Sequence, residues 1–229
     1  MPTDGAMTLS AGAFGAWLSQ ARAALHGDGG ADVPCGDCVG CCVSSYHIPI
    51  RPTDRAARDA IPIQYLQRVS MRPDDPLMLG YLDDGLCPML KQGRCSIYAQ
   101  RPQTCRDYDC RVFAAAGIEA GDAAKRVINE RVRAWRFNYA TDVDRELHAA
   151  VRAAAAFIQS KREAFPQGCA PKASTGVAVL AIKTYEVFMT DLSAKSDADI
   201  ARALLDAAQA FDAAPAAAMQ PSELRERPV

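Results

Sequence analysis

The chain has 229 residues, of which 49% are hydrophobic and 23% charged, and its net charge is −1. A chain of this length buries a real core, so it does not need cysteines as the staples of a very small domain. The balanced charge argues against a general electrostatic partner such as duplex nucleic acid, and no run approaches the ~18 apolar residues of a membrane span.

The N-terminal half is predicted to be a mixture of short elements. Residues 8–25 carry an apolar stripe at helical spacing and are predicted to be a helix, and the Gly- and Asp-rich stretch that follows is predicted to be a loop. Short helices are expected over about 54–60, after the N-cap candidate Asp54, and over 63–69 after a proline. A strand is expected over 77–82.

The second cysteine-containing stretch is predicted to fold around a small hairpin. Residues 87–98 read as two short strands joined by a glycine-containing turn, which would place Cys87 and Cys95 near the open ends of a β ribbon. Residues 101–111, opened by Pro102, are expected to be irregular.

After Gly121 the chain becomes Ala-rich and helical in pattern. Apolar stripes predict helices around residues 128–139, 147–158, 177–189 and 200–211, and Ser196 to Asp199 resembles a capping box for the last one. The predicted organisation is an N-terminal helix over 1–30, a cysteine-cluster metal-binding domain over 31–120, a helical region over 121–212 packed on it, and a disordered tail over 213–229. The fold class is α+β, mainly α, with a cysteine-rich loop and β-hairpin half packed against a C-terminal helical half.

Eight of the nine cysteines fall into two groups, and they carry the functional prediction. The first group has the spacing C-x2-C-x2-C-C and the second is more widely spaced. Soft thiolates select zinc, copper(I) or iron–sulfur clusters. The predicted metal ligands are therefore Cys35, Cys38, Cys41 and Cys42 of the first group and Cys87, Cys95, Cys105 and Cys110 of the second. The ninth, Cys169, lies outside this pattern and is expected to be a free thiol.

The cellular compartment supports metal binding over disulfides. The first 25 residues contain no Lys or Arg before Arg22 and no long apolar core, so they do not resemble a signal peptide. We therefore expect a cytoplasmic protein, where clustered cysteines are metal ligands or redox groups more often than disulfides. The alternative is a secreted disulfide domain, which the adjacent Cys41 and Cys42 disfavour because disulfide geometry is restrictive.

The sequence favours iron, as an iron–sulfur cluster, and leaves zinc as the alternative. Cys35, Cys38 and Cys41 have the spacing of ferredoxin-like cluster loops, in which a remote cysteine followed by proline completes the ligand set, and Cys87 precedes Pro88. Four plus four cysteines would equally make two tetrahedral zinc sites. Which cysteines share a metal stays open.

The pattern over residues 35–110 closely resembles the YkgJ-type CxxCxxCC cysteine-cluster family, a zinc- or iron-chelating domain. The resemblance rests on the first group and on Cys87-Pro88-x-Leu90, Gly93-x-Cys95-x-Ile97-Tyr98, Arg101-Pro102-x-x-Cys105-Arg106 and Cys110. It implies a metal centre and no particular reaction. A similar cluster occurs in flagellin lysine N-methylases, where it is associated with an iron–sulfur centre, but the helical half shows no recognisable methyl-donor site.

Arginines surround the second group: Arg94, Arg101, Arg106 and Arg111. Guanidinium groups can offset the negative charge of metal-bound thiolates, or they can be solvated or paired with neighbouring aspartates. Arg101 and Arg106 match positions of the family pattern, so we expect them beside the site. His47 is interpreted as a polar neighbour, and the basic run around Trp135 as a solvated helix face.

Two classes of function remain. In the first, the centre is redox-active or catalytic, as in an iron–sulfur oxidoreductase or a lysine-methylase-like enzyme. In the second, zinc is structural and the protein is an interaction or scaffold module, because a zinc site closed by four cysteines has no open position. Metal delivery is a third reading. A metal ion is the expected partner, and neither nucleic acid nor a membrane is expected.

Overall fold

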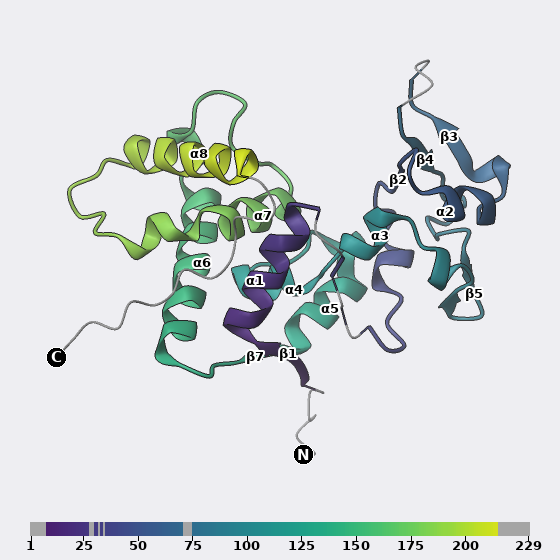
Figure 1. Ribbon diagram of the computed structural model, residues 1–229, viewed down its shortest axis with the longest axis horizontal. Helices are drawn as coiled ribbons and strands as arrows, with labels where there is room; N and C mark the ends of the chain where they lie inside the picture. The colour runs from purple at the N-terminus through teal and green to yellow at the C-terminus, as the bar shows by residue number, and fades with distance from the viewer. Residues whose placement is uncertain (1–7, 28–29, 32, 34, 71–74, 215–229) are drawn as a thin grey trace. The chain divides into compact units, whose positions relative to one another are not determined.

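The computed structural model describes residues 8–27, 30–31, 33, 35–70 and 75–214. They fall into two compact units that alternate along the chain (Figure 1). Unit 1 contains Gly30–Cys110 and Glu119–Trp135, and unit 2 contains Thr8–Gly29, Arg111–Ile118 and the chain from Arg136 onward. The protein is mainly α with small sheets, which confirms the predicted fold class. The predicted domain boundaries differ from these cuts and remain a prediction, and the predicted tail lies almost wholly outside the described residues.

Unit 1 is built on two small antiparallel sheets. The first has the strand order β2 (Pro49–Ile50), β4 (Leu77–Leu79) and β3 (Leu66–Arg68). The second is the predicted hairpin of β5 (Leu90–Lys91) and β6 (Arg94–Cys95), in which Leu90 pairs with Cys95. Both residues of its turn, Gln92 and Gly93, have positive φ, as a two-residue hairpin turn of this type requires.

The helices of unit 1 are short. They are the 3-10 turns η1 (Gly40–Val43), η2 (Ile63–Tyr65), η3 (Tyr98–Gln100) and η4 (Ala123–Lys125) and the α-helices α2 (Arg55–Ala60), α3 (Gln103–Asp107) and α5 (Arg126–Ala134). The prediction of a helix over 63–69 was wrong, because only one 3-10 turn forms before the chain enters β3. The prediction of irregular structure over 101–111 was also wrong, since Pro102 opens α3 rather than preventing it.

The core of unit 1 is small and contains cysteines. Its buried side chains are Ile48, Ile50, Ala57, Ile61, Leu79, Cys87, Met89 and Ile97. Cys42, Cys95 and Cys105 are partly buried and pack against these residues. One clustered cysteine therefore belongs to the apolar core and three more pack against it, where a bare thiol behaves as a small hydrophobe.

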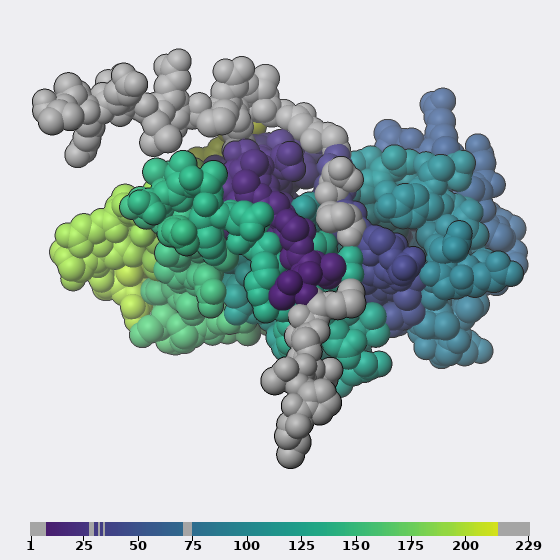
Figure 2. Space-filling model, turned by 90° about the horizontal axis from the view of Figure 1, so that it is seen from below, coloured from purple at the N-terminus to yellow at the C-terminus, as the bar shows by residue number. Residues whose placement is uncertain are grey.

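Unit 2 is a helical assembly. Its elements are β1 (Leu9–Ala13), α1 (Phe14–Leu25), α4 (Arg111–Ala116), most of β7 (Trp135–Asn138), α6 (Asp142–Ser160), η5 (Arg162–Ala164), α7 (Ser174–Thr184), η6 (Tyr185–Met189) and α8 (Asp197–Ala213). Helices α4, α6 and α7 pack on one another, α1 contacts α6 and α7, and α8 lies along α7 (Figure 1). The space-filling view shows purple α1 lying against green residues of the same unit (Figure 2).

An aromatic cluster and two capping boxes stabilise unit 2. The ring of His148 stacks on Phe14 with centroids 4.3 Å apart, and Phe137 packs edge-on against Phe14. Thr141 with Asp144 caps α6, and Ser196 with Asp199 caps α8, which confirms the capping box predicted for the last helix.

Three other predicted helices needed correction at their ends. Residues 9–13 of the predicted helix over 8–25 form β1, which pairs with β7, and Gly12 within this strand has a φ of +90°. The helix predicted over 128–139 ends at Ala134, and β7 begins at Trp135. The stretch 177–189 is α7 up to Thr184 and then the 3-10 turn η6. In the described part of the chain, no helix is both long and apolar enough to cross a membrane.

Candidate metal centre

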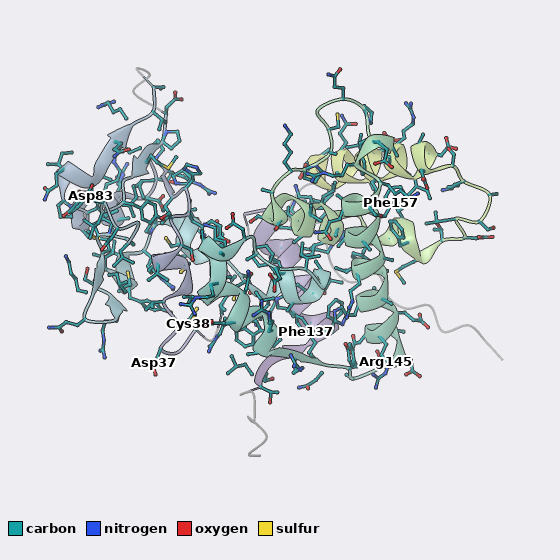
Figure 3. All side chains as sticks on the ribbon, turned by 180° about the vertical axis from the view of Figure 1, so that it is seen from behind. Asp37, Cys38, Asp83, Phe137, Arg145 and Phe157 are labelled. Atoms are coloured by element: carbon teal, nitrogen blue, oxygen red, sulfur yellow. The ribbon has the colours of Figure 1, made fainter. Side chains whose placement is uncertain are left out.

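The first cysteine group lies on a tight loop that leads into η1. The amide of Cys38 donates to the carbonyl of Cys35 at 3.0 Å, and Gly36 between them has a φ of +54°, which glycine adopts without strain. The amide of Gly40 points at the Sγ of Cys38, 3.5 Å away. Figure 3 shows Asp37 at the outer tip of this loop, next to Cys38.

Gly40 holds this loop close to α5. A Cβ at this position would lie 3.0 Å from Cγ1 of Ile128, a fully buried residue of α5, and 3.5 Å from the Sγ of Cys38. Only a residue without a side chain lets the cysteine loop and α5 approach to this distance.

The second group comes from three different elements. Cys87 precedes β5, Cys95 ends β6, Cys105 lies in α3, and Cys110 follows α3. Helix α3 is fixed by the carboxylate of Asp54, which accepts from the amide of Gln103 at 2.9 Å. Asp54 was predicted to be the N-cap of α2, but its side chain makes no capping hydrogen bond there. It accepts instead from α3, the helix that contains Cys105.

A backbone hydrogen bond joins the two sequence groups. The amide of Cys87 donates to the carbonyl of Cys42 at 2.8 Å. Within the first group, the Sγ atoms of Cys41 and Cys42 are 4.0 Å apart. The fold therefore brings together thiols that stand about fifty residues apart in the sequence.

Five of the eight cysteines line one cavity of about 70 Å³ in unit 1. They are Cys35, Cys38, Cys41, Cys105 and Cys110, and so include members of both sequence groups. The rest of the wall includes Tyr98, Arg101, Tyr108, Ile128 and Arg131. The other three cysteines, Cys42, Cys87 and Cys95, lie in or against the small apolar core.

Electrostatics among these thiols favours a bound cation. Cys42 is hydrogen-bonded to both Cys41 and Cys87, which raises the pKa of Cys42 and lowers the pKa of each partner. Burial raises the pKa of Cys105 and of Cys110 to about 12, because a buried thiolate loses its hydration. Thiolates gathered in this way are stable only when protons or metal ions neutralise them.

Polar groups of α5 and its C-terminal neighbour support the cavity wall. The indole Nε1 of Trp135 donates to the Sγ of Cys110 at 3.3 Å. Arg131 lies over the ring of Trp135 and donates to the carbonyl of Cys35 at 2.9 Å. These contacts of Trp135 and Arg131 were not predicted from the sequence, because the basic run around Trp135 was interpreted as a solvated helix face. The helical spacing of Ile128 and Arg131 was the only signal that they share a side of α5.

The four arginines singled out by the sequence have different positions. Arg101 lines the cavity and stacks over Tyr98, with 3.7 Å between its guanidinium carbon and the ring centroid. Arg106 is exposed and donates to the carbonyls of Arg101 and Ala99, so it orders the loop. Arg94 is exposed, and Arg111 is buried in unit 2, where it donates to the carbonyl of Ala11. His47 and Cys169 are exposed.

The donor set fits a metal that soft ligands select, but the thiols are not arranged as a closed site. Across the described ranges, no three His, Cys, Asp or Glu side chains stand close enough to hold one metal ion together. Ligands of a single zinc ion lie about 3.8 Å apart, because four Zn–S bonds of about 2.3 Å form a tetrahedron. Thiolates of an iron–sulfur cluster each bind a separate iron and surround a larger volume.

A scan against family models identifies this region. The model of the CxxCxxCC family, described as "Putative zinc- or iron-chelating domain", matches residues 34–130. No curated protein and no solved structure matches the chain. The match covers all eight clustered cysteines and confirms the resemblance predicted from their spacing. Residues 34–130 are therefore similar to the zinc- or iron-chelating domain that this family model describes.

Proposed function

We propose that this protein binds iron as an iron–sulfur cluster, held by cysteines of both sequence groups around the cavity of unit 1. The observation that supports this proposal is the cavity of about 70 Å³ with five cysteines on its wall. A single zinc ion fills the space between its four thiolates. A cluster brings its own sulfides and needs a larger hollow of this kind.

The thiol neighbours of Cys110 and Cys35 support one set of four ligands. Cys110 has Cys38 and Cys35 as its charged thiol neighbours, and Cys35 has Cys41 and Cys38. We propose Cys35, Cys38, Cys41 and Cys110 as the cluster ligands and name them the cavity set. Such a cluster would supply one-electron transfer. The protein's own contribution is to hold these thiols and to give them hydrogen bonds from Trp135 and the loop amides.

The remaining cysteines support a second, structural site. Cys105 lines the cavity and has Cys41 as well as Cys87 and Cys95 among its neighbours, and Cys42 is hydrogen-bonded to both Cys87 and Cys41. We name Cys42, Cys87, Cys95 and Cys105 the core set, because they lie in or against the apolar core of unit 1. A zinc ion closed by four cysteines would have no open position there. If both sets held zinc, the protein would be an interaction or scaffold module.

Metal analysis of protein purified without air tests the proposal. We expect iron with matching acid-labile sulfide and broad visible absorption that bleaches on reduction. Zinc without sulfide or visible absorption would contradict the cluster and leave the structural module.

Serine variants test the division of ligands. Cys110→Ser should remove most of the iron and sulfide, since it takes one ligand from the cavity set, while Cys95→Ser should lower the zinc content and spare the sulfide. Cys169→Ser is the matched control, because its thiol is exposed and lies outside unit 1. Equal loss of sulfide from Cys95→Ser and Cys110→Ser would refute two separate sets.

A further inference from the structure

Arg101 is held in place by its backbone at the edge of the cavity. It follows η3 and precedes the buried Pro102, which restricts its backbone to the extended region in which it lies. Its carbonyl accepts from Nε of Arg106 at 2.9 Å. The side chain therefore starts from a rigid turn, and its stacking on Tyr98 fixes the plane of the guanidinium.

The Nε–H of Arg101 is a buried donor without an acceptor. Of the side-chain atoms described, it is one of three that are fully buried and lack a hydrogen-bond partner. Leaving a buried donor unpaired costs about 1–3 kcal/mol, and more when the group is charged. Arg131 on the same cavity differs, because it donates to the carbonyl of Cys35.

The cavity wall to which Arg101 belongs carries five cysteine sulfurs. Arg101 is a neighbouring cation of Cys35 and Cys41 of the cavity set and of Cys95 and Cys105 of the core set. Its charge thus acts on cysteines of both proposed sets. Metal-bound thiolates and cluster sulfides leave net negative charge, and guanidinium N–H groups stabilise such charge.

We propose that Arg101 is the positioning residue of the metal centre, balancing its charge and donating Nε–H to a metal-bound sulfur at the cavity. This inference rests on the proposed metal binding. In this inference, the single side chain of Arg101 serves both the cavity set and the core set. Because a reduced centre is one charge more negative, Arg101 should also raise its reduction potential.

The test uses the full chain as purified, with Arg101→Met, Arg101→Lys and the control Arg94→Met. Arg94 is exposed beside Cys95, so its variant removes a charge of the same kind from the same neighbourhood. The first readout is the EDTA concentration that removes half of the bound metal. Arg101→Met should lower metal affinity about 10- to 100-fold, the usual loss for such a supporting residue. Arg94→Met should leave it unchanged.

Arg101→Lys and the reduction potential separate charge balance from simple packing. Lysine keeps the cation, so it should recover most of the affinity, and the midpoint potential should move to more negative values only in Arg101→Met. The inference would be overturned if Arg101→Met bound metal within twofold of wild type. It would also be overturned if Arg101→Lys bound metal as weakly as Arg101→Met. A protein that carries zinc alone would refute the proposed cluster, and the EDTA readout would still decide the role of Arg101. A wild-type protein without metal would refute both.

Discussion

At the scale of single residues, Cys110 shows how the protein prepares a thiol for metal. Burial raises its pKa, and the indole N–H of Trp135 acts in the opposite direction by stabilising the thiolate. The guanidinium of Arg131 stacks on the same ring and donates a hydrogen bond to the backbone carbonyl of Cys35 in the cysteine loop. One aromatic side chain thus connects a ligand of the second group with the loop of the first.

Replacing this indole by a ring without a donor should weaken metal binding. Trp135→Phe keeps most of the packing but removes the hydrogen bond to Cys110, so we expect metal affinity to fall about tenfold in an EDTA titration. Trp17→Phe in unit 2 is the control and should leave metal affinity unchanged. Equal affinities of Trp135→Phe and wild type would show that the N–H contact is not used.

His148 predicts how the stability of unit 2 depends on pH. Burial and then the charge of Arg152 lower its pKa below the usual 6.5, against backbone hydrogen bonds that act to raise it. Below that pH the unfolded chain takes up the proton more readily than the folded chain, so stability is full above about pH 6.5 and is lost as the pH falls.

The corresponding measurement is urea unfolding at about pH 7.5 and about pH 5.5. Wild type should lose free energy of unfolding between the two values, and His148→Gln should lose less, by at most about 1.4 kcal/mol for each pH unit. The same pH slope in both proteins would mean that His148 titrates as in the unfolded chain.

At the scale of elements, structures set by neighbouring residues could be predicted from the sequence. The pairing of strands far apart in the chain could not. The hairpin of β5 and β6 was predicted because its turn needs only Gln92 and Gly93. Strand β1 was missed because its Leu- and Ala-rich residues also fit a helix, and its partner β7 lies more than a hundred residues later.

The candidate site shows the same limit. Five of the predicted cysteines and Arg101 lie on the cavity wall, and all of them were named from local patterns of spacing. Their division across the cavity could not be predicted in this way, because Cys110 stands closer in sequence to Cys105 yet has Cys35 and Cys38 as its thiol neighbours. The role of Trp135 depends on where α5 ends, which periodicity alone does not determine.

The capping box of α8 gives a prediction for a single element. Ser196 accepts from the amide of Asp199 at 3.2 Å, so Ser196→Ala leaves that amide without its partner. We expect the free energy of unfolding to fall by about 1 kcal/mol in urea titration. Ser160→Ala, at the exposed end of α6, is the matched control and should change stability less. If both variants lose the same amount, the cap contributes nothing specific.

At the scale of the whole molecule, the two units differ in what stabilises them. Unit 2 has helices of up to 19 residues and an aromatic cluster, whereas the strands of unit 1 have two or three residues each. The core of unit 1 also includes the thiol of Cys87, and three further thiols pack against it. Bound metal should therefore be part of the folding energy of unit 1 and not of unit 2.

Metal removal should accordingly loosen one unit only. With chelator and reductant, hydrogen exchange should accelerate in residues 35–70, 75–110 and 119–135, while amides of α6 and α8 keep their protection. Protein with its metal retained is the control. Uniform acceleration throughout the described residues would show that the units unfold together, and no acceleration would show that unit 1 is stable without metal.

The interleaving of the two units has a consequence for synthesis on the ribosome. Unit 1 ends at Trp135, before α6 begins at Asp142, whereas α1 must wait for α6 and α7 to find its partners. At about 5–20 residues per second, that delay is on the order of ten seconds. All eight clustered cysteines leave the ribosome before the helices that complete unit 2. The thiols of unit 1 are therefore available to bind metal before the helices of unit 2 are complete.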